Sequence, residues 1–262
     1  MNSVLKATFW YTINELWLTV LWNIIKKEKV MKKRIFLTMV LLGGLIMMGL
    51  AACGENKNSR EWIENKVSEV SRVYPTENLF DLFKQFPEGF NITQTFYKDS
   101  LRTVVSLDGD EESQTIKGKI ETIQISTDPY KEEVKEHVDV EYKDGEFIFS
   151  NNEVAEKIWD YKGFLFQKLS LNRDVLSQMK LEKFQYFSNR NVFAIYYISD
   201  NSTINNFLNS NGEHMLSISG AESYNNTKGY RLNVNIAFKD TPNDGMSEIV
   251  SSWIDDRNSV SN

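Results

Sequence analysis

The chain has 262 residues, of which 41% are hydrophobic and 25% charged, with a formal net charge of −6 and one cysteine. This composition is typical of a globular protein and excludes an intramolecular disulfide. The acidic balance also argues against a nucleic-acid partner, because phosphate binding needs a broad basic surface.

The first informative segment is a signal-like sequence at residues 31–52. A basic cluster at residues 32–34 precedes an apolar run at residues 35–50, and two small residues then come directly before Cys53. Basic, apolar and small-residue regions in this order are typical of a secretory signal peptide. A cysteine after the small pair indicates a bacterial lipoprotein signal, since a thiol is the nucleophile that accepts a diacylglyceryl group. We therefore predict cleavage between Ala52 and Cys53, and lipid attachment at Cys53.

The alternative for residues 35–50 is a transmembrane helix followed by an unrelated cysteine. Sixteen residues are short for a membrane span, and Gly43, Gly44 and Gly49 weaken a helix. The lipoprotein signal is favoured for these reasons. Two acyl chains hold a protein on a bilayer far longer than one chain does.

Residues 1–30 form an unusual extension, because a signal peptide normally starts with its basic cluster. Lys27-Glu28 can be encoded by a purine-rich ribosome-binding sequence, at a spacing that suits initiation at Met31. We therefore predict that residues 1–30 are not translated. The rival interpretation is a genuine membrane helix that includes Trp10, Trp17 and Trp22.

The exported part of the chain is strongly acidic. Without residues 1–52 it holds 23 basic and 34 acidic residues, a net charge of −11. An anionic bilayer repels such a domain, so we expect membrane contact only through the acylated Cys53. Residues 53–60 are polar and predict a tether on which the domain stands off the membrane. Residues 54–60 span roughly 20 Å when extended.

Residues 61–262 are predicted to form a single α+β domain, with N-terminal helices packed on an extensive, mainly antiparallel sheet. Helical spacing of apolar residues predicts helices at residues 60–73, 79–86 and 152–159. Shorter helices are predicted at residues 202–208 and 246–254. Residues 157–180 are the one stretch that could mark a seam between two halves.

Alternation of apolar and polar residues predicts the strands. They are expected at residues 91–98, 102–107, 115–126, 138–142, 146–149, 183–188, 192–199, 215–220 and 230–238. Asp144-Gly145 predicts a tight hairpin, and the acidic run at residues 108–112 predicts a turn.

The chain resembles the staphylococcal tandem lipoproteins. The matching features are Leu-Ala-Ala-Cys-Gly at residues 50–54, Tyr-Pro-x-x-Asn-Leu-x-Asp-Leu at residues 74–82, Phe-Gln-Tyr-Phe at residues 184–187, and Gly-Tyr at residues 229–230. The resemblance implies a lipid-anchored protein on the outer face of the cytoplasmic membrane of a Gram-positive bacterium. It also implies a role in host-cell contact and immune recognition, without catalytic residues.

The residues themselves offer no catalytic or metal-binding pattern. His137 is expected on the polar face of a strand and His214 in a turn, both solvated and without a shared ligand. The acidic run at residues 108–112 lacks the alternating ligands and distal glutamate of a calcium loop. We therefore predict no enzyme activity, no metal and no cofactor.

Aromatic residues crowd two neighbouring predicted strands: Phe184, Tyr186, Phe187, Phe193, Tyr196 and Tyr197. Core packing is the default expectation, and an aromatic ligand groove is the alternative. Two functions follow. The first is a non-enzymatic surface module that contacts a host or envelope protein. The second is a lipoprotein that binds a small solute or an envelope polymer, which requires a concave site.

Overall fold

The computed structural model describes residues 55–160, 163–225, 229–239, 241 and 244–253. The chain from Lys57 onward forms one compact unit. The predicted signal peptide, its cleavage site and Cys53 lie outside the described residues.

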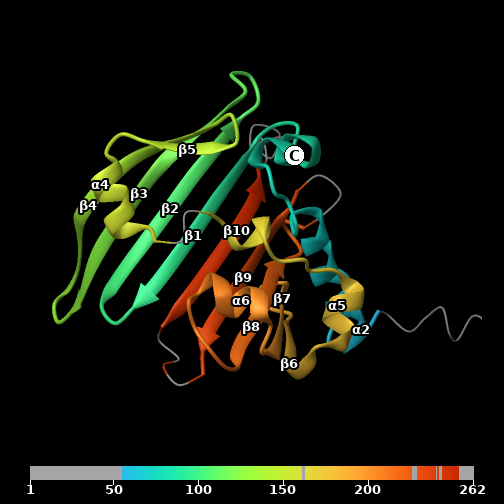
Figure 1. Cartoon of the computed structure of the whole chain (residues 1–262). Coiled ribbons are helices and arrows are strands. Elements are labelled where there is room, and N and C mark those ends of the chain that lie inside the picture. Colours follow the sequence, from blue (N-terminus) through green and yellow to red (C-terminus); the bar gives the residue numbers. More distant parts are fainter. Residues whose placement is uncertain (1–54, 161–162, 226–228, 240, 242–243, 254–262) are drawn as a thin grey trace, which may run out of the picture. The chain divides into compact units, whose positions relative to one another are not determined.

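The described strands form one ten-stranded antiparallel sheet in the order β5-β4-β3-β2-β1-β10-β9-β8-β7-β6 (Figure 1). They are β1 (Phe90–Lys98), β2 (Leu101–Asp110), β3 (Thr115–Thr127), β4 (Tyr130–Lys143), β5 (Glu146–Phe149), β6 (Lys180–Phe187), β7 (Val192–Ser199), β8 (His214–Ala221), β9 (Arg231–Phe238) and β10 (Gly245–Ser252). Strands that follow one another in the chain pair within each half. The two halves join where β1 pairs with β10, the last described strand.

Short helices cover one face of this sheet (Figure 1). They are α2 (Arg60–Val67), η1 (Ser68–Arg72), η2 (Leu79–Asp81), α3 (Leu82–Gln85), α4 (Asn152–Ile158), η3 (Leu165–Gln167), α5 (Arg173–Gln178) and α6 (Ser202–Phe207). Five of them have an N-cap residue whose side-chain oxygen accepts a backbone N–H of the first turn. The N-cap residues are Ser59, Asn78, Asn151, Asn172 and Asn201. The structure confirms the predicted α+β class.

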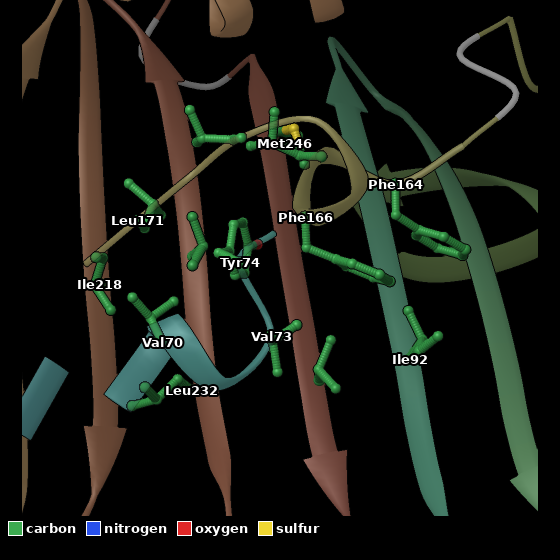
Figure 2. Close-up of a cluster of buried hydrophobic side chains, with 14 of the residues drawn as sticks. Val70, Val73, Tyr74, Ile92, Phe164, Phe166, Leu171, Ile218, Leu232 and Met246 are labelled. Carbon is green, nitrogen blue, oxygen red and sulfur yellow. The ribbon is translucent and has the colours of Figure 1, made fainter. Parts of the chain in front are cut away.

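The core lies between the sheet and these helices. Figure 2 shows side chains from the N-terminal helical region and from the segment after α4 gathered over the strands. The buried residues labelled there are Val70, Val73, Tyr74, Ile92, Phe164, Phe166, Leu171, Ile218, Leu232 and Met246. Sheet residues of this cluster alternate along their strands, so each strand gives one face to the core.

The prediction of a helix at residues 246–254 is wrong. Apolar residues at 246, 249, 250 and 253 have helical spacing, yet this segment is β10, at the centre of the sheet. Met246 and Val250 face the core, whereas Ser247 lies opposite Thr95 of β1 and Asn235 of β9. The apolar alternation is hidden in the sequence because the core-facing residue between Met246 and Val250 is Glu248.

Most predicted turns and strands are confirmed. Asp144 and Gly145 have positive φ angles of 54° and 86°, as a two-residue hairpin between β4 and β5 requires. The acidic run is a partial exception, because Asp108 and Asp110 still belong to β2 and the turn starts after them. The Asp110 carboxylate accepts hydrogen bonds from the backbone and the hydroxyl of Ser113, which lower its pKa.

The segment between α4 and β6, which the sequence marked as a possible seam, crosses the covered face of the sheet. It contributes Phe164, Leu165 and Phe166 to the core, all fully buried. A buried carboxylate fixes it: the backbone N–H groups of Leu165 and Phe166 donate to Glu248 on β10, at 2.8 and 2.9 Å. The segment therefore spans the sheet as part of the core.

The Glu248 carboxylate accepts hydrogen bonds from two more donors. The Tyr74 hydroxyl donates at 2.6 Å and the Gln94 amide at 2.7 Å, while Trp159 Nε1 donates to the Gln94 carbonyl oxygen. Burial raises the pKa of Glu248, although all four hydrogen bonds act against this shift. The network joins an N-terminal loop, two strands and the crossing segment at one point.

Candidate functional site

The first described residues contact β6 and the residue that follows β8. Lys57 Nζ pairs with the Glu222 carboxylate at 2.8 Å, and Tyr186 donates its hydroxyl to the same carboxylate. The Asn58 side chain accepts the backbone N–H of Tyr186 at 3.1 Å. We call Lys57, Asn58, Trp62, Tyr186 and Glu222 the attachment cluster.

Aromatic contacts reinforce the attachment cluster. The Trp62 and Tyr186 rings meet edge to face with centroids 5.3 Å apart, and Lys57 Nζ lies 5.8 and 5.6 Å from these rings. Burial raises the pKa of Glu222, but hydrogen bonds from Lys57 and Tyr186 outweigh it and keep that pKa below its usual value. The carboxylate is therefore ionised at neutral pH, and the ion pair with Lys57 is formed.

This cluster shortens the predicted tether. Residues 54–60 were expected to extend freely, but Lys57 and Asn58 are already bound to the domain and helix α2 begins at Arg60. Only residues 54–56 separate Cys53 from Lys57. Four residues span at most about 14 Å, so a lipid on Cys53 would hold the domain close to the bilayer.

A pocket of about 520 Å³ lies at the ends of the strands, between the β1–β2 turn, the start of β8 and the C-terminal end of α6. Its lining is mixed: Thr103, Asp160, Asn211, Lys239 and Asp244 are polar, and Phe96, Leu208 and Phe238 are apolar. Such a volume suits a small solute. Lys239 already pairs with Glu213 at 2.7 Å, and Asp244 accepts the backbone N–H of Asp99 at 3.0 Å.

His214 lies on the wall of this pocket, and its prediction as a solvated turn residue is wrong. It is the first residue of β8 and is 3% exposed. Its Nε2 donates to the side-chain oxygen of Asn205 at 2.7 Å and lies 3.0 Å from the Ser210 hydroxyl. Burial lowers its pKa, so the imidazole is neutral at neutral pH. Its described partners are neutral, so no carboxylate orients it as a general base.

His137 lies on a strand as predicted, whereas only the end of the acidic run lies in the predicted turn. His137 is exposed on β4, with Nε2 3.1 Å from Asp139 and Nδ1 3.5 Å from Glu121. The Asp110 carboxylate accepts hydrogen bonds from Ser113, in the turn that follows β2. Within the described ranges, no three His, Cys, Asp or Glu side chains converge as a metal site would require.

The aromatic pairs of β6 and β7 are mainly core residues, as predicted. Phe193 and Tyr197 are fully buried, and Phe184 and Tyr186 pack against the core from β6. Phe187 points to the opposite face and is 39% exposed. Tyr186, Phe193 and Tyr197 contact Trp62 and Glu64 of α2, so these side chains serve packing between the sheet and the helix.

Sequence reasoning missed Glu248 and the attachment cluster. Glu248 was assigned to a helix, and its role depends on donors far away in the sequence. Lys57, Tyr186 and Glu222 are also widely separated along the chain. No local pattern could have found these contacts.

No protein-family model matches the chain, and no curated protein is significantly similar to it. Among the helices that the structure describes, none has the length and hydrophobicity to cross a membrane.

Proposed function

We propose that this chain is a lipid-anchored, non-enzymatic surface protein of a Gram-positive bacterium, held on the outer face of the cytoplasmic membrane through Cys53. The observation that carries the proposal is the sequence Leu-Ala-Ala-Cys-Gly at residues 50–54, after a basic cluster and an apolar run. The folded unit that starts at Lys57 supports it, because a domain that begins directly after the lipid site is what an exported lipoprotein needs.

The function of the displayed domain is proposed to be contact with a host or envelope protein, as the resemblance to the tandem lipoproteins implies. Two structural observations agree with a non-enzymatic role at these positions. The buried histidine has only neutral described partners, and the aromatic side chains of β6 and β7 serve the core. Neither arrangement supplies paired acid and base groups for catalysis.

The test of the anchor is replacement of its nucleophile. Cys53→Ser should give an unprocessed protein that takes up no fatty-acid label, because a serine hydroxyl does not accept the diacylglyceryl group. Gly54→Ser is the matched control and should be processed and labelled like the wild type. Fatty-acid labelling of Cys53→Ser at the mature size would contradict the proposal.

The pocket at the strand ends favours a second candidate, a lipoprotein that binds a small solute. Its mixed polar and apolar lining and its volume of about 520 Å³ are the supporting observations. A panel of sugars, amino acids and peptides should then include a compound that raises the melting temperature. Asn211→Ala should abolish that shift, because Asn211 lines the pocket. Asn189→Ala, in the distant β6–β7 turn, should keep it. A panel without any shift would leave the protein-contact proposal as the better one.

A further inference from the structure

We infer that the β6 edge of the sheet lies against the bilayer. This surface consists of β6, the β6–β7 turn and the residues around Glu222. The inference rests on the proposed acylation of Cys53 and adds the orientation in which the anchored domain is held. Its partner is a phospholipid surface.

The first argument is the length of the chain before the fixed residues. Cys53 precedes Lys57 by four residues, and Lys57 is paired with Glu222. A lipidated Cys53 lies at the level of the headgroups. Lys57 must then lie within about 14 Å of that level, whatever path the intervening residues take. The attachment cluster is therefore held close to the membrane.

The second argument is the distribution of charge. Residues 101–149, which form β2 to β5, contain 13 acidic and 6 basic residues, a net charge of −7. Residues 180–221, which form β6 to β8 with α6, contain 3 acidic and 3 basic residues and have no net charge. Nine strand spacings of about 4.8 Å separate β6 from β5, so the edges are roughly 43 Å apart. With β6 toward the bilayer, the acidic half is several Debye lengths from anionic headgroups.

The third argument is the chemistry of the surface near the attachment cluster. Phe187 follows Tyr186 and is 39% exposed, while Tyr224 lies two residues after Glu222 and is 44% exposed. Lys183 and Arg190 are also exposed there. Exposed aromatic rings beside basic side chains suit the interface between headgroups and acyl chains.

The test uses the full lipidated protein on vesicles of phosphatidylglycerol and phosphatidylcholine. Cys53 is the only native cysteine and carries the lipid, so an introduced cysteine takes a spin label at one position. Gln185→Cys places the label on β6, and Glu146→Cys places the matched control on β5. Both residues are exposed. Asn189→Cys, in the β6–β7 turn, gives a second reading should the label at residue 185 disturb β6.

We expect collision of a water-soluble relaxation agent with the label at residue 185 to fall several-fold on vesicles, and collision at residue 146 to stay as in free solution. Equal accessibility at both positions on floating protein would overturn the orientation. Protection at residue 185 that appears only at high protein density would also overturn it, because it would assign the β6 edge to a second copy of the chain. A protein that does not float with the vesicles would instead refute the anchor.

Discussion

Glu248 shows how one buried carboxylate can organise distant parts of a chain. One of its oxygens accepts from the Tyr74 hydroxyl and the Phe166 N–H, and the other from the Gln94 amide and the Leu165 N–H. A glutamine has the same shape but presents an NH₂ group where one oxygen stood. Two buried donors would then face a third donor.

We therefore expect Glu248→Gln to lower the free energy of unfolding by about 1 to 3 kcal/mol, the range for a buried donor left without its acceptor. Urea unfolding of the mature chain, followed by tryptophan fluorescence, measures this change. Glu146→Gln is the control, because Glu146 is exposed on β5, and it should change the free energy by less than about 0.5 kcal/mol. Equal effects of the two substitutions would show that the network contributes nothing.

The pH dependence of this difference tests which effect dominates at Glu248. Burial raises its pKa above the value of 4.5 for a free glutamate, despite the four donors. As pH rises through 4.5, the unfolded chain ionises first, so Glu248 contributes stability at low pH that is lost as pH approaches the folded pKa. The stability advantage of the wild type over Glu248→Gln should therefore shrink between pH 4.5 and neutrality. An advantage that grows with pH would mean that the hydrogen bonds outweigh burial.

At the scale of elements, β10 is the strand on which the sheet depends most. It pairs with β1 on one side and β9 on the other, and Ser247 at its centre is 9% exposed. Ser247→Pro would remove a ladder N–H and force the ring against a neighbouring strand. We expect a loss of at least about 3 kcal/mol, seen as a lower urea midpoint.

Ser202→Pro is the matched control for this substitution. Ser202 is exposed and is the first residue of α6, where proline needs no N–H partner. Its urea midpoint should stay near that of the wild type. If Ser247→Pro were equally harmless, the segment at residues 245–252 would not be a central strand.

The sequence predicted the elements whose pattern is local. The strands near β7 and β9 alternate plainly, and Asp144-Gly145 marks its hairpin by turn chemistry alone. It failed at β10, because Glu248 breaks the apolar alternation and Ile249 restores a helical spacing by chance. A buried charge is unfavourable without partners, and its partners are supplied by the fold.

The same distinction applies to the candidate sites. Cys53 was predicted from contiguous residues, and that prediction needs no knowledge of the fold. His214 was misplaced because its burial depends on Asn205, Ser210 and the Phe238 ring, which the fold brings around it. The short tether could not be predicted either, since Lys57 and Glu222 are 165 residues apart in the sequence and only the fold brings them together.

At the scale of the whole molecule, the two halves of the sheet are joined at its centre by the first and the last strand in the sequence. β1 begins at Phe90 and pairs with β10, which ends at Ser252, while the turns that join β1 to β5 are short. Pairing between such distant segments carries a loop-closure entropy cost that the pairs of consecutive strands largely avoid. Each half exposes an unpaired strand edge until β10 has been added between β1 and β9.

We therefore expect removal of residues 245–262 to abolish the cooperative unfolding transition of the mature chain, because it exposes the edges of β1 and β9 and removes Glu248 from the core. Removal of residues 254–262 alone is the control and should retain the transition, since the described strands end before it. Circular dichroism during urea titration distinguishes the two, and limited proteolysis should cut the shorter chain throughout. A folded, protease-resistant half in the chain that ends at residue 244 would show that the two halves of the sheet are independent units.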